Sequence, residues 1–116
     1  MTCREQDVRG VRVLRLEGDI TALAMVELDN LLQRCQEHQV QRLVLDFDDV
    51  ADISYRGVGL LSERAFRIRG AGGEVKVAGL HGTVAEAFAF VGADRLIDIY
   101  GSSEEALGSF GVPLGA

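Results

Sequence analysis

The chain has 116 residues, of which 47% are hydrophobic, so we expect residues 1–116 to form a single domain with a buried core rather than a disordered segment. Its formal net charge of -6, with only 12 Lys and Arg residues, disfavours nucleic-acid binding, which needs a basic surface to neutralise phosphates. Since no apolar run approaches the roughly 20 residues of a membrane span and the amino terminus lacks the apolar core of a signal peptide, we expect a cytoplasmic protein without membrane contact.

The first predicted elements are two strands and a helix. A weak strand over residues 3–8 and a stronger one over residues 11–17 flank the Arg9-Gly10 pair, which favours a tight hairpin turn. Residues 18–21 then end the second strand and provide capping groups for a helix over residues 22–38. One apolar face of this helix is predicted from the spacing of Leu28, Leu31, Leu32 and Cys35.

The middle of the chain is predicted to form a buried strand, a polar loop and a second helix. The nearly continuous apolar run over residues 43–47 is typical of a strand in a sheet that is covered on both faces. The helix is predicted over residues 57–69 and ends at the glycine-rich residues 70–73. Its apolar side consists of Val58, Leu61, Ala65 and Ile68.

The last part of the chain is predicted to add two strands and two helices. A strand over residues 75–78 precedes a helix whose apolar stripe consists of Val84, Ala87, Phe88 and Val91. A strand over residues 96–100 leads to a capping box formed by Ser102 and Glu105, which opens a short terminal helix. Residues 110–116 are expected to form a loose tail.

This order of elements predicts an α/β fold. Two strands followed by alternating helices and strands give a mixed, mostly parallel sheet of about five strands with right-handed crossovers. The N-terminal hairpin adds an antiparallel edge, and about four helices cover the sheet.

The polar loop before the second predicted helix carries the most distinctive chemistry. Ser54 and Tyr55 place hydroxyl groups at the amino end of the helix, where a negative group such as phosphate is favoured. This loop is therefore a candidate for covalent control or partner binding, beside the simpler interpretation as a turn. Gly57 and Gly59 begin an incomplete glycine fingerprint in which Ser62 replaces the third glycine, so close helix packing is favoured over nucleotide binding.

Other polar residues give little indication of a metal or catalytic site. The acidic residues around the end of the buried strand are Asp46, Asp48, Asp49 and Asp52, and they match no calcium-loop spacing, so ordinary turn chemistry is favoured. The isolated thiols and imidazoles are Cys3, Cys35, His38 and His81, which lack the spacing of metal ligands. We expect no metal, no cofactor and no catalytic residue.

The predicted second helix carries several arginines. Arg64, Arg67 and Arg69 lie on it, and Arg56 lies just before it. Such residues form either a solvated helix face or a basic patch for an acidic partner, and the sequence leaves both interpretations open.

Several short segments together resemble a known family. They are residues 16–20 and 43–47, Val50, Ile53, and residues 57–61, 72–79 and 94–97. In this order and spacing they resemble the STAS domain family, the fold of bacterial anti-sigma factor antagonists. The resemblance extends from about Val11 to Leu107 and implies a STAS-like α/β fold.

The polar loop departs from the pattern of this family, which is Asp-Ser-Ser-Gly or Asp-Ser/Thr-x-Gly with the first hydroxyl residue phosphorylated by a partner kinase. Aligned on Gly57 and Gly59, the aspartate of the family falls on Ser54, the phosphoacceptor on Tyr55 and the next position on Arg56. A serine kinase is not expected to modify the tyrosine, and Ser54 could accept phosphate only in a remodelled loop. A register that uses Asp52 as the aspartate requires two inserted residues before Gly57.

The resemblance implies a protein-interaction module without enzymatic activity. Its partner would be an anti-sigma factor or a related histidine-kinase-like ATPase, bound through the loop and helix around residues 52–69. The expected contact residues are Asp52, Ser54, Tyr55, Arg56, Gly57 and Gly59. The alternatives are a sensor of a nucleotide or lipid, and a STAS subunit of a signalling assembly or transporter ATPase; whether the protein forms a homodimer is left open.

Overall fold

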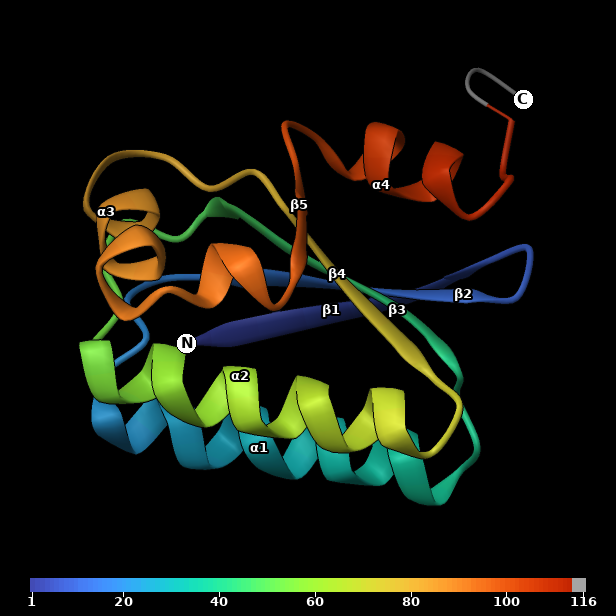
Figure 1. The fold of residues 1–116 in the computed structure, drawn as a ribbon, viewed down its shortest axis with the longest axis horizontal. Helices are drawn as coiled ribbons and strands as arrows, with labels where there is room; N and C mark the ends of the chain where they lie inside the picture. The colour runs from blue at the N-terminus through green and yellow to red at the C-terminus, as the bar shows by residue number, and fades with distance from the viewer. Residues whose placement is uncertain (114–116) are drawn as a thin grey trace.

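The computed structural model describes residues 1–113, in which a five-stranded sheet has helices on both faces (Figure 1). The strands are β1 (Thr2–Val8), β2 (Val11–Glu17), β3 (Arg42–Asp49), β4 (Glu74–Ala78) and β5 (Asp98–Tyr100). The helices are α1 (Ala22–Glu37), α2 (Tyr55–Gly70), α3 (Gly82–Val91) and α4 (Ser103–Ser109), with a 3-10 turn over Ala93–Arg95. None of the helices in residues 1–113 combines the length and the apolar character that crossing a membrane requires.

The strands lie across the sheet in sequence order. Strands β1 and β2 are antiparallel, and each later neighbouring pair is parallel. Arg9 and Gly10 form the predicted hairpin turn, with positive φ values of 49° and 85° that suit a two-residue turn between twisted strands. The predicted α/β fold, with a mixed and mostly parallel sheet and an antiparallel N-terminal hairpin, is confirmed.

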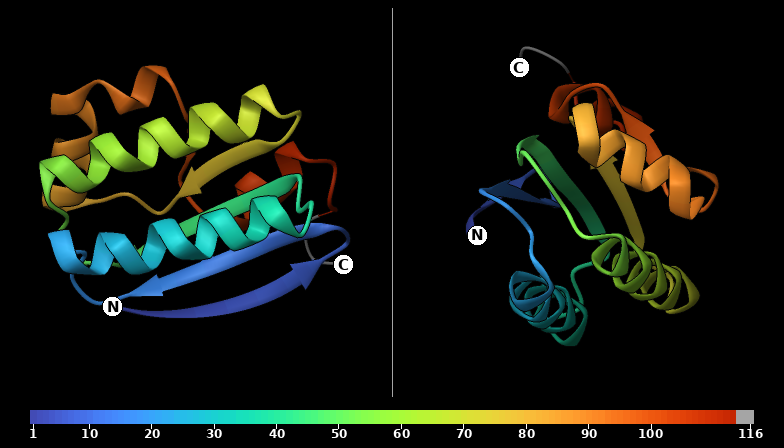
Figure 2. Two further views of the ribbon diagram at one scale, coloured as in Figure 1. Left: turned by 90° about the horizontal axis from the view of Figure 1, so that it is seen from below. Right: turned by 90° about the vertical axis from the view of Figure 1, so that its left-hand side faces the viewer.

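Helices α1 and α2 lie side by side along one face of the sheet and begin at the same end of the molecule (Figure 2). Thr21 caps α1 as predicted, since its hydroxyl accepts a hydrogen bond from the Ala24 backbone N–H at 3.2 Å. The main apolar core lies between these helices and the sheet, and includes Leu28, Leu45 and Leu61. This arrangement places the start of α2 at the end of the molecule where β3 ends.

The opposite face of the sheet carries a smaller apolar cluster, which packs against α4. Its buried members are Val11, Val13, Val44, Ala78 and Ala106. Because side chains of a strand alternate between the two faces, Val44 joins this cluster while Leu43 and Leu45 join the main core. Strand β3 is thus covered on both faces, which explains its nearly continuous apolar sequence.

Three predicted element boundaries differ from the structure by two residues, and one of them is the end of β3, which lies at Asp49 rather than at Phe47. Helix α2 begins at Tyr55 rather than at Gly57, because Ser54 caps it and brings the next two residues into the first turn. Strand β5 begins at Asp98 rather than at Leu96, because the backbone N–H groups of residues 96 and 97 donate to the Ala93 carbonyl, both at 3.0 Å. The preceding segment is therefore a tight turn and not a strand.

Three side-chain expectations also change. Leu31 is only half-buried, and Val91 is exposed, although both lie on predicted apolar stripes. In the expected tail, Phe110 and Val112 pack against the cluster under α4, so apolar packing continues beyond residue 110. Residues 114–116 of that tail lie outside the described residues.

Candidate functional site

The polar loop between β3 and α2 is held by backbone hydrogen bonds to the connection between β2 and α1. The Ile20 backbone N–H donates to the Asp52 carbonyl at 2.9 Å, and the Ser54 backbone N–H donates to the Ile20 carbonyl at 3.2 Å. Ile20 and Ile53 form an isolated parallel bridge, and both side chains are buried. The loop therefore has a defined backbone that presents the residues on either side of Ile53 at the surface.

Ser54 is the N-cap of α2. Its hydroxyl oxygen accepts a hydrogen bond from the Gly57 backbone N–H at 3.0 Å, which satisfies one of the free donors at the helix start. Its backbone is extended, with φ -71° and ψ 146°, as an N-cap requires. Ser54 is half-buried, and its oxygen already serves the helix.

Asp52 lies beside α3. The hydroxyl group of Thr83, in the first turn of α3, lies 3.0 Å from the Ala51 carbonyl and 3.3 Å from a carboxylate oxygen of Asp52. His81, just before α3, approaches the Asp48 carbonyl with its Nε2 at 2.9 Å. The start of α3 is thus attached to the loop that precedes α2.

Gly57 and Gly59 have different surroundings. A β-carbon at Gly57 would lie 2.6 Å from Cγ of Met25, so the absence of a side chain lets α1 and α2 approach closely. A β-carbon at Gly59 would have no heavy atom within 4 Å. The close-packing interpretation of the glycine pair therefore holds for Gly57 only, while Gly59 borders open space.

Tyr55 and Phe90 form an exposed aromatic pair at the start of α2. Their rings are stacked, with centroids 4.9 Å apart and planes inclined by 22°. Tyr55 is 57% exposed and Phe90 is 76% exposed, so the pair is in contact with solvent over most of its area. Because each ring restricts the other, stacking limits the conformations that the tyrosine side chain can adopt.

Further exposed residues surround this pair. Arg56 and Leu60 are exposed on the first two turns of α2, with Gly59 between them in sequence. We call these residues, together with Tyr55 and Phe90, the Tyr55 surface. Two more exposed apolar residues, Leu23 and Val26, lie at the start of α1. They flank Met25 in the sequence, and Met25 is the residue of α1 that packs against Gly57 of α2.

The arginines of α2 are mostly paired. Arg64 donates two hydrogen bonds to Asp29 of α1, at 2.8 and 3.1 Å, and this contact raises the pKa of its guanidinium. Arg67 pairs with Glu63 at 2.9 Å, and Arg69 pairs with Glu74 at 2.8 Å. Within residues 1–113, Arg56 forms no ion pair, so it alone of these four keeps an uncompensated charge at the surface.

The acidic residues at the end of β3 have structural contacts. Asp46 is buried; its carboxylate accepts a hydrogen bond from the Asp48 backbone N–H at 2.9 Å and lies 3.3 Å from Nε of Arg15. Over residues 1–113, no three His, Cys, Asp or Glu side chains are grouped closely enough to hold a metal ion. The turn interpretation accounts for the Asp46 and Asp48 contacts.

Three residues of this region were not among the sequence-based candidates: Met25, Thr83 and Phe90. Phe90 carried a usable signal, because it lies off the apolar stripe of its helix and an aromatic residue there is expected to be exposed. Thr83 and Met25 carried none, because their roles depend on which helices become neighbours. The structure brings Ser54 and Gly57 into contact, places Tyr55 against α3, and leaves Gly59 without a contact for a side chain.

Comparison with known proteins gives a consistent architecture. A family model described as the STAS domain matches residues 4–106. An anti-sigma factor antagonist from Mycobacterium paratuberculosis has a similar structure, with a TM-score of 0.85, 19% identity, and coverage of 93% of this chain and 92% of that chain. The phosphorylated form of the Bacillus cell fate determinant SpoIIAA gives a TM-score of 0.72 at 19% identity, with coverage of 94% and 99%.

A transporter-related structure is also similar. A sulfate transporter family protein from Wolinella succinogenes gives a TM-score of 0.75 at 17% identity, with coverage of 88% of this chain and 85% of that chain. At these identities the likenesses establish the fold. No curated protein matches the sequence at a significant level.

Proposed function

Because the chain belongs to the STAS domain family, we propose that it is a protein-interaction module that binds an anti-sigma factor or a related histidine-kinase-like ATPase through the Tyr55 surface. Residues 52–59 and the start of α2 form the centre of the contact, with Asp52, Ser54 and Gly57 shaping the backbone. Phe90 of α3 extends the contact beyond the loop. The module acts by binding and sequestering its partner, without a catalytic step of its own.

The observation that carries this proposal is the exposed stacked pair of Tyr55 and Phe90. Two aromatic rings in solvent contribute little to the core, and exposed apolar patches are typical of interaction sites. Tyrosine and arginine are both enriched among the residues that dominate binding energies. Since the rings already restrict each other, little conformational entropy is lost when a partner covers them.

The proposed binding is constitutive rather than controlled by phosphate. The resemblance places Tyr55 at the position of the family's phosphoacceptor, and a serine kinase is not expected to modify a tyrosine there. Ser54 caps α2, so its oxygen would have to leave the Gly57 N–H for the hydroxyl to react in a kinase active site. A phosphate would add negative charge and three acceptor oxygens at the helix start, whereas the free Arg56 provides a cation for an acidic group of the partner.

Affinity capture tests the proposed contact. The wild-type protein, the Tyr55→Ala variant and a Leu96→Ala control are immobilised, and proteins captured from the native lysate are identified by mass spectrometry. Leu96 is an exposed apolar residue outside the Tyr55 surface, so its variant controls for loss of any surface side chain. We expect an ATPase of the anti-sigma-factor type to be captured by the wild-type protein and the control, and much less by Tyr55→Ala.

The same capture separates the alternatives. Recovery of transporter components instead of such an ATPase would assign the module to a transport assembly and contradict the proposed partner. The module is a small-molecule sensor if the capture of no protein depends on Tyr55 and if a nucleotide or lipid raises the melting temperature of the wild-type protein.

A phosphorylation assay tests the proposed loss of the switch. The protein is incubated with ATP and a kinase that is either encoded by a neighbouring gene or recovered in the affinity capture. Modified residues are then located by mass spectrometry. We expect Tyr55 to remain unmodified, and phosphate on Tyr55 would refute this. Phosphate on Ser54 would instead show that the switch survives in a shifted register, so binding would not be constitutive.

A further inference from the structure

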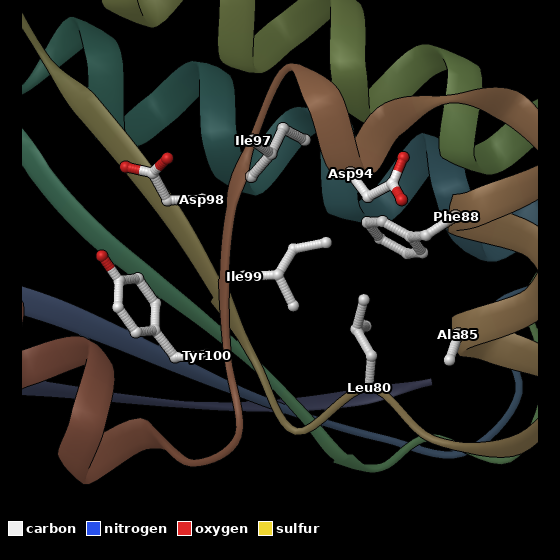
Figure 3. Close-up of a pocket in the computed structure, with 8 residues that line it drawn as sticks. All are labelled: Leu80, Ala85, Phe88, Asp94, Ile97, Asp98, Ile99 and Tyr100. Atoms are coloured by element: carbon white, nitrogen blue, oxygen red, sulfur yellow. The ribbon is translucent and has the colours of Figure 1, made fainter.

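A shallow groove of about 620 Å³ lies between β5 and α3, at the edge of the sheet (Figure 3). Leu80, Phe88 and Ile99 give it an apolar lining, and Asp94 stands at one end. Its volume is in the range of sites that bind small molecules or peptide side chains. It uses none of the residues of the Tyr55 surface.

Strand β5 borders the groove with a free backbone edge. In the sheet, β5 has β4 as its only neighbour among the described strands. The Tyr100 carbonyl accepts a hydrogen bond from the Gly79 backbone N–H at 3.1 Å, so the polar backbone groups of Tyr100 face β4. Because successive residues of an extended strand direct these groups to opposite edges, the N–H and C=O of Ile99 face away from the sheet.

The side chains of β5 divide between the two sides of the strand. In Figure 3, Ile99 projects toward Leu80 and Phe88, whereas Asp98 and Tyr100 project to the other side. Ile99 is 36% exposed, so its apolar side chain still has area to bury. Thus the same residue offers free backbone groups at the edge and an apolar contact in the groove.

Two carboxylates lie at this edge, and one of them faces the groove. Asp94 and Asp98 are both exposed, and neither forms an ion pair within residues 1–113. Arg95, the cation closest to them in sequence, is exposed and forms no ion pair with either of them. Because Asp98 projects to the other side of β5, the carboxylate that faces the groove is that of Asp94, and a cationic group of a ligand complements it there.

We propose that the groove and the free edge of β5 bind an extended segment of a partner protein in which an apolar residue and a Lys or Arg stand two positions apart, so that both side chains project to the same side of the segment. The segment adds a short strand beside β5, with its backbone hydrogen-bonded to Ile99. One apolar side chain of the segment enters the groove against Ile99, Leu80 and Phe88. A basic side chain pairs with Asp94.

The free backbone edge favours a peptide over a small amphiphilic amine as the occupant. An amine with an apolar tail would use the groove and the carboxylate, but it would leave the N–H and C=O of Ile99 without partners. A peptide satisfies all three features together. Its binding is independent of the Tyr55 surface, so the two proposals can fail separately.

Selection from a random peptide library tests this proposal. Peptides of about eight residues, long enough to form an added strand, are selected on the immobilised wild-type protein and counter-selected on the Ile99→Lys variant. We expect the selected peptides to carry an apolar residue and a Lys or Arg two positions apart, on the same side of an extended strand. In calorimetry, Asp94→Lys should weaken their binding by about tenfold or more, because a charge pair is replaced by a repulsion.

Matched controls make the outcome specific. Glu86→Lys, which reverses an exposed charge on α3 outside the groove, and Tyr55→Ala should leave the affinity within about twofold. Methylation of the peptide nitrogen that faces Ile99 should remove most of the binding, because it removes a backbone donor. The proposal is overturned if Ile99→Lys and Asp94→Lys bind the selected peptides as tightly as the wild type. It is also overturned if N-methylation has no effect, or if octylamine shifts the backbone NMR signals of Ile99 and Leu80 while no selected peptide does.

Discussion

The ammonium group of Lys76 lies 4.2 Å from the ring centroid of Phe110 and donates a hydrogen bond to the Ser109 hydroxyl at 2.7 Å. Lys76 is a residue of β4 and is only 8% exposed, yet no carboxylate pairs with it within residues 1–113. A hydroxyl and the face of an aromatic ring therefore replace the water that this cation loses. The contact attaches the end of α4 to the sheet.

Lys76→Met tests this attachment, because methionine keeps most of the apolar stem and removes the ammonium group. We expect a loss of about 1 kcal/mol in the free energy of unfolding, from the hydrogen bond and the cation–π contact. Hydrogen exchange of the α4 amides should become faster. Unchanged stability together with unchanged α4 exchange would show that Lys76 does not hold the helix.

Leu45→Ala tests the main core. Leu45 lies on the central strand β3 and is 0% exposed, so its truncation leaves a cavity between the sheet and the helices. We expect chemical denaturation to show a loss of about 2–5 kcal/mol. The exposed Leu96→Ala should change stability by less than about 0.5 kcal/mol. A loss below about 1 kcal/mol for Leu45→Ala would place this residue outside the core.

Gly57→Ala and Gly59→Ala form a matched pair in the same helix. At Gly59 the added methyl group meets open space, so we expect a gain of up to about 1 kcal/mol from the higher helix propensity of alanine. At Gly57 the methyl group would meet Met25, so we expect a loss of about 1–3 kcal/mol from overpacking. Equal stabilisation by both substitutions, measured by denaturation, would contradict the close packing of α1 on α2.

Cys3 should react slowly with thiol reagents. Burial, and then the charges of Glu5 and Cys35, raise the pKa of Cys3 to about 11 from an ordinary value of 9.0, which keeps the group as an unreactive thiol at neutral pH. Since the pKa is raised in the folded state, the stability linked to this thiol is present below pH 9 and is lost as pH rises through about 11.

The alkylation rate of Cys3 as a function of pH checks this shift. A Cys35→Ala background leaves Cys3 as the reacting thiol, and in the folded protein the rate should rise with a midpoint well above 9.0 but somewhat below 11, because the contribution of Cys35 is removed. In urea the midpoint should return to the ordinary value of 9.0. Equal midpoints in the folded protein and in urea would show that folding does not raise the pKa of the Cys3 thiol.

Periodicity and turn chemistry were sufficient to predict the order of the main helices and strands and a mixed, mostly parallel sheet with an antiparallel hairpin. The continuous apolar run at Leu43–Phe47 marked the central strand, and Arg9 and Gly10 marked the hairpin turn. Helix ends were less predictable. Ser54 can cap a helix or continue a loop, and only its hydrogen bond to the Gly57 N–H places Tyr55 inside the first turn.

Contacts between elements distant in sequence could not be predicted from local patterns. The loop was identified as the candidate site from the resemblance and its hydroxyl residues. However, the stacking of Tyr55 on Phe90 depends on how α3 packs beside α2. The same holds for Arg64, whose pairing with Asp29 across α1 and α2 argues against the basic patch that the sequence left open.

Calorimetry on the captured partner tests the central claim, that Tyr55 and Phe90 form one binding surface. Tyr55→Ala, Phe90→Ala, Arg56→Ala and the Tyr55→Ala/Phe90→Ala double variant are titrated with the partner after circular dichroism has shown that each is folded. We expect each single substitution to weaken binding by about 1–2 kcal/mol or more. The double variant should lose less than the sum of its two single losses, because each ring positions the other. If the folded double variant binds its partner with wild-type affinity, the interface lies elsewhere and the proposed function of this surface is wrong.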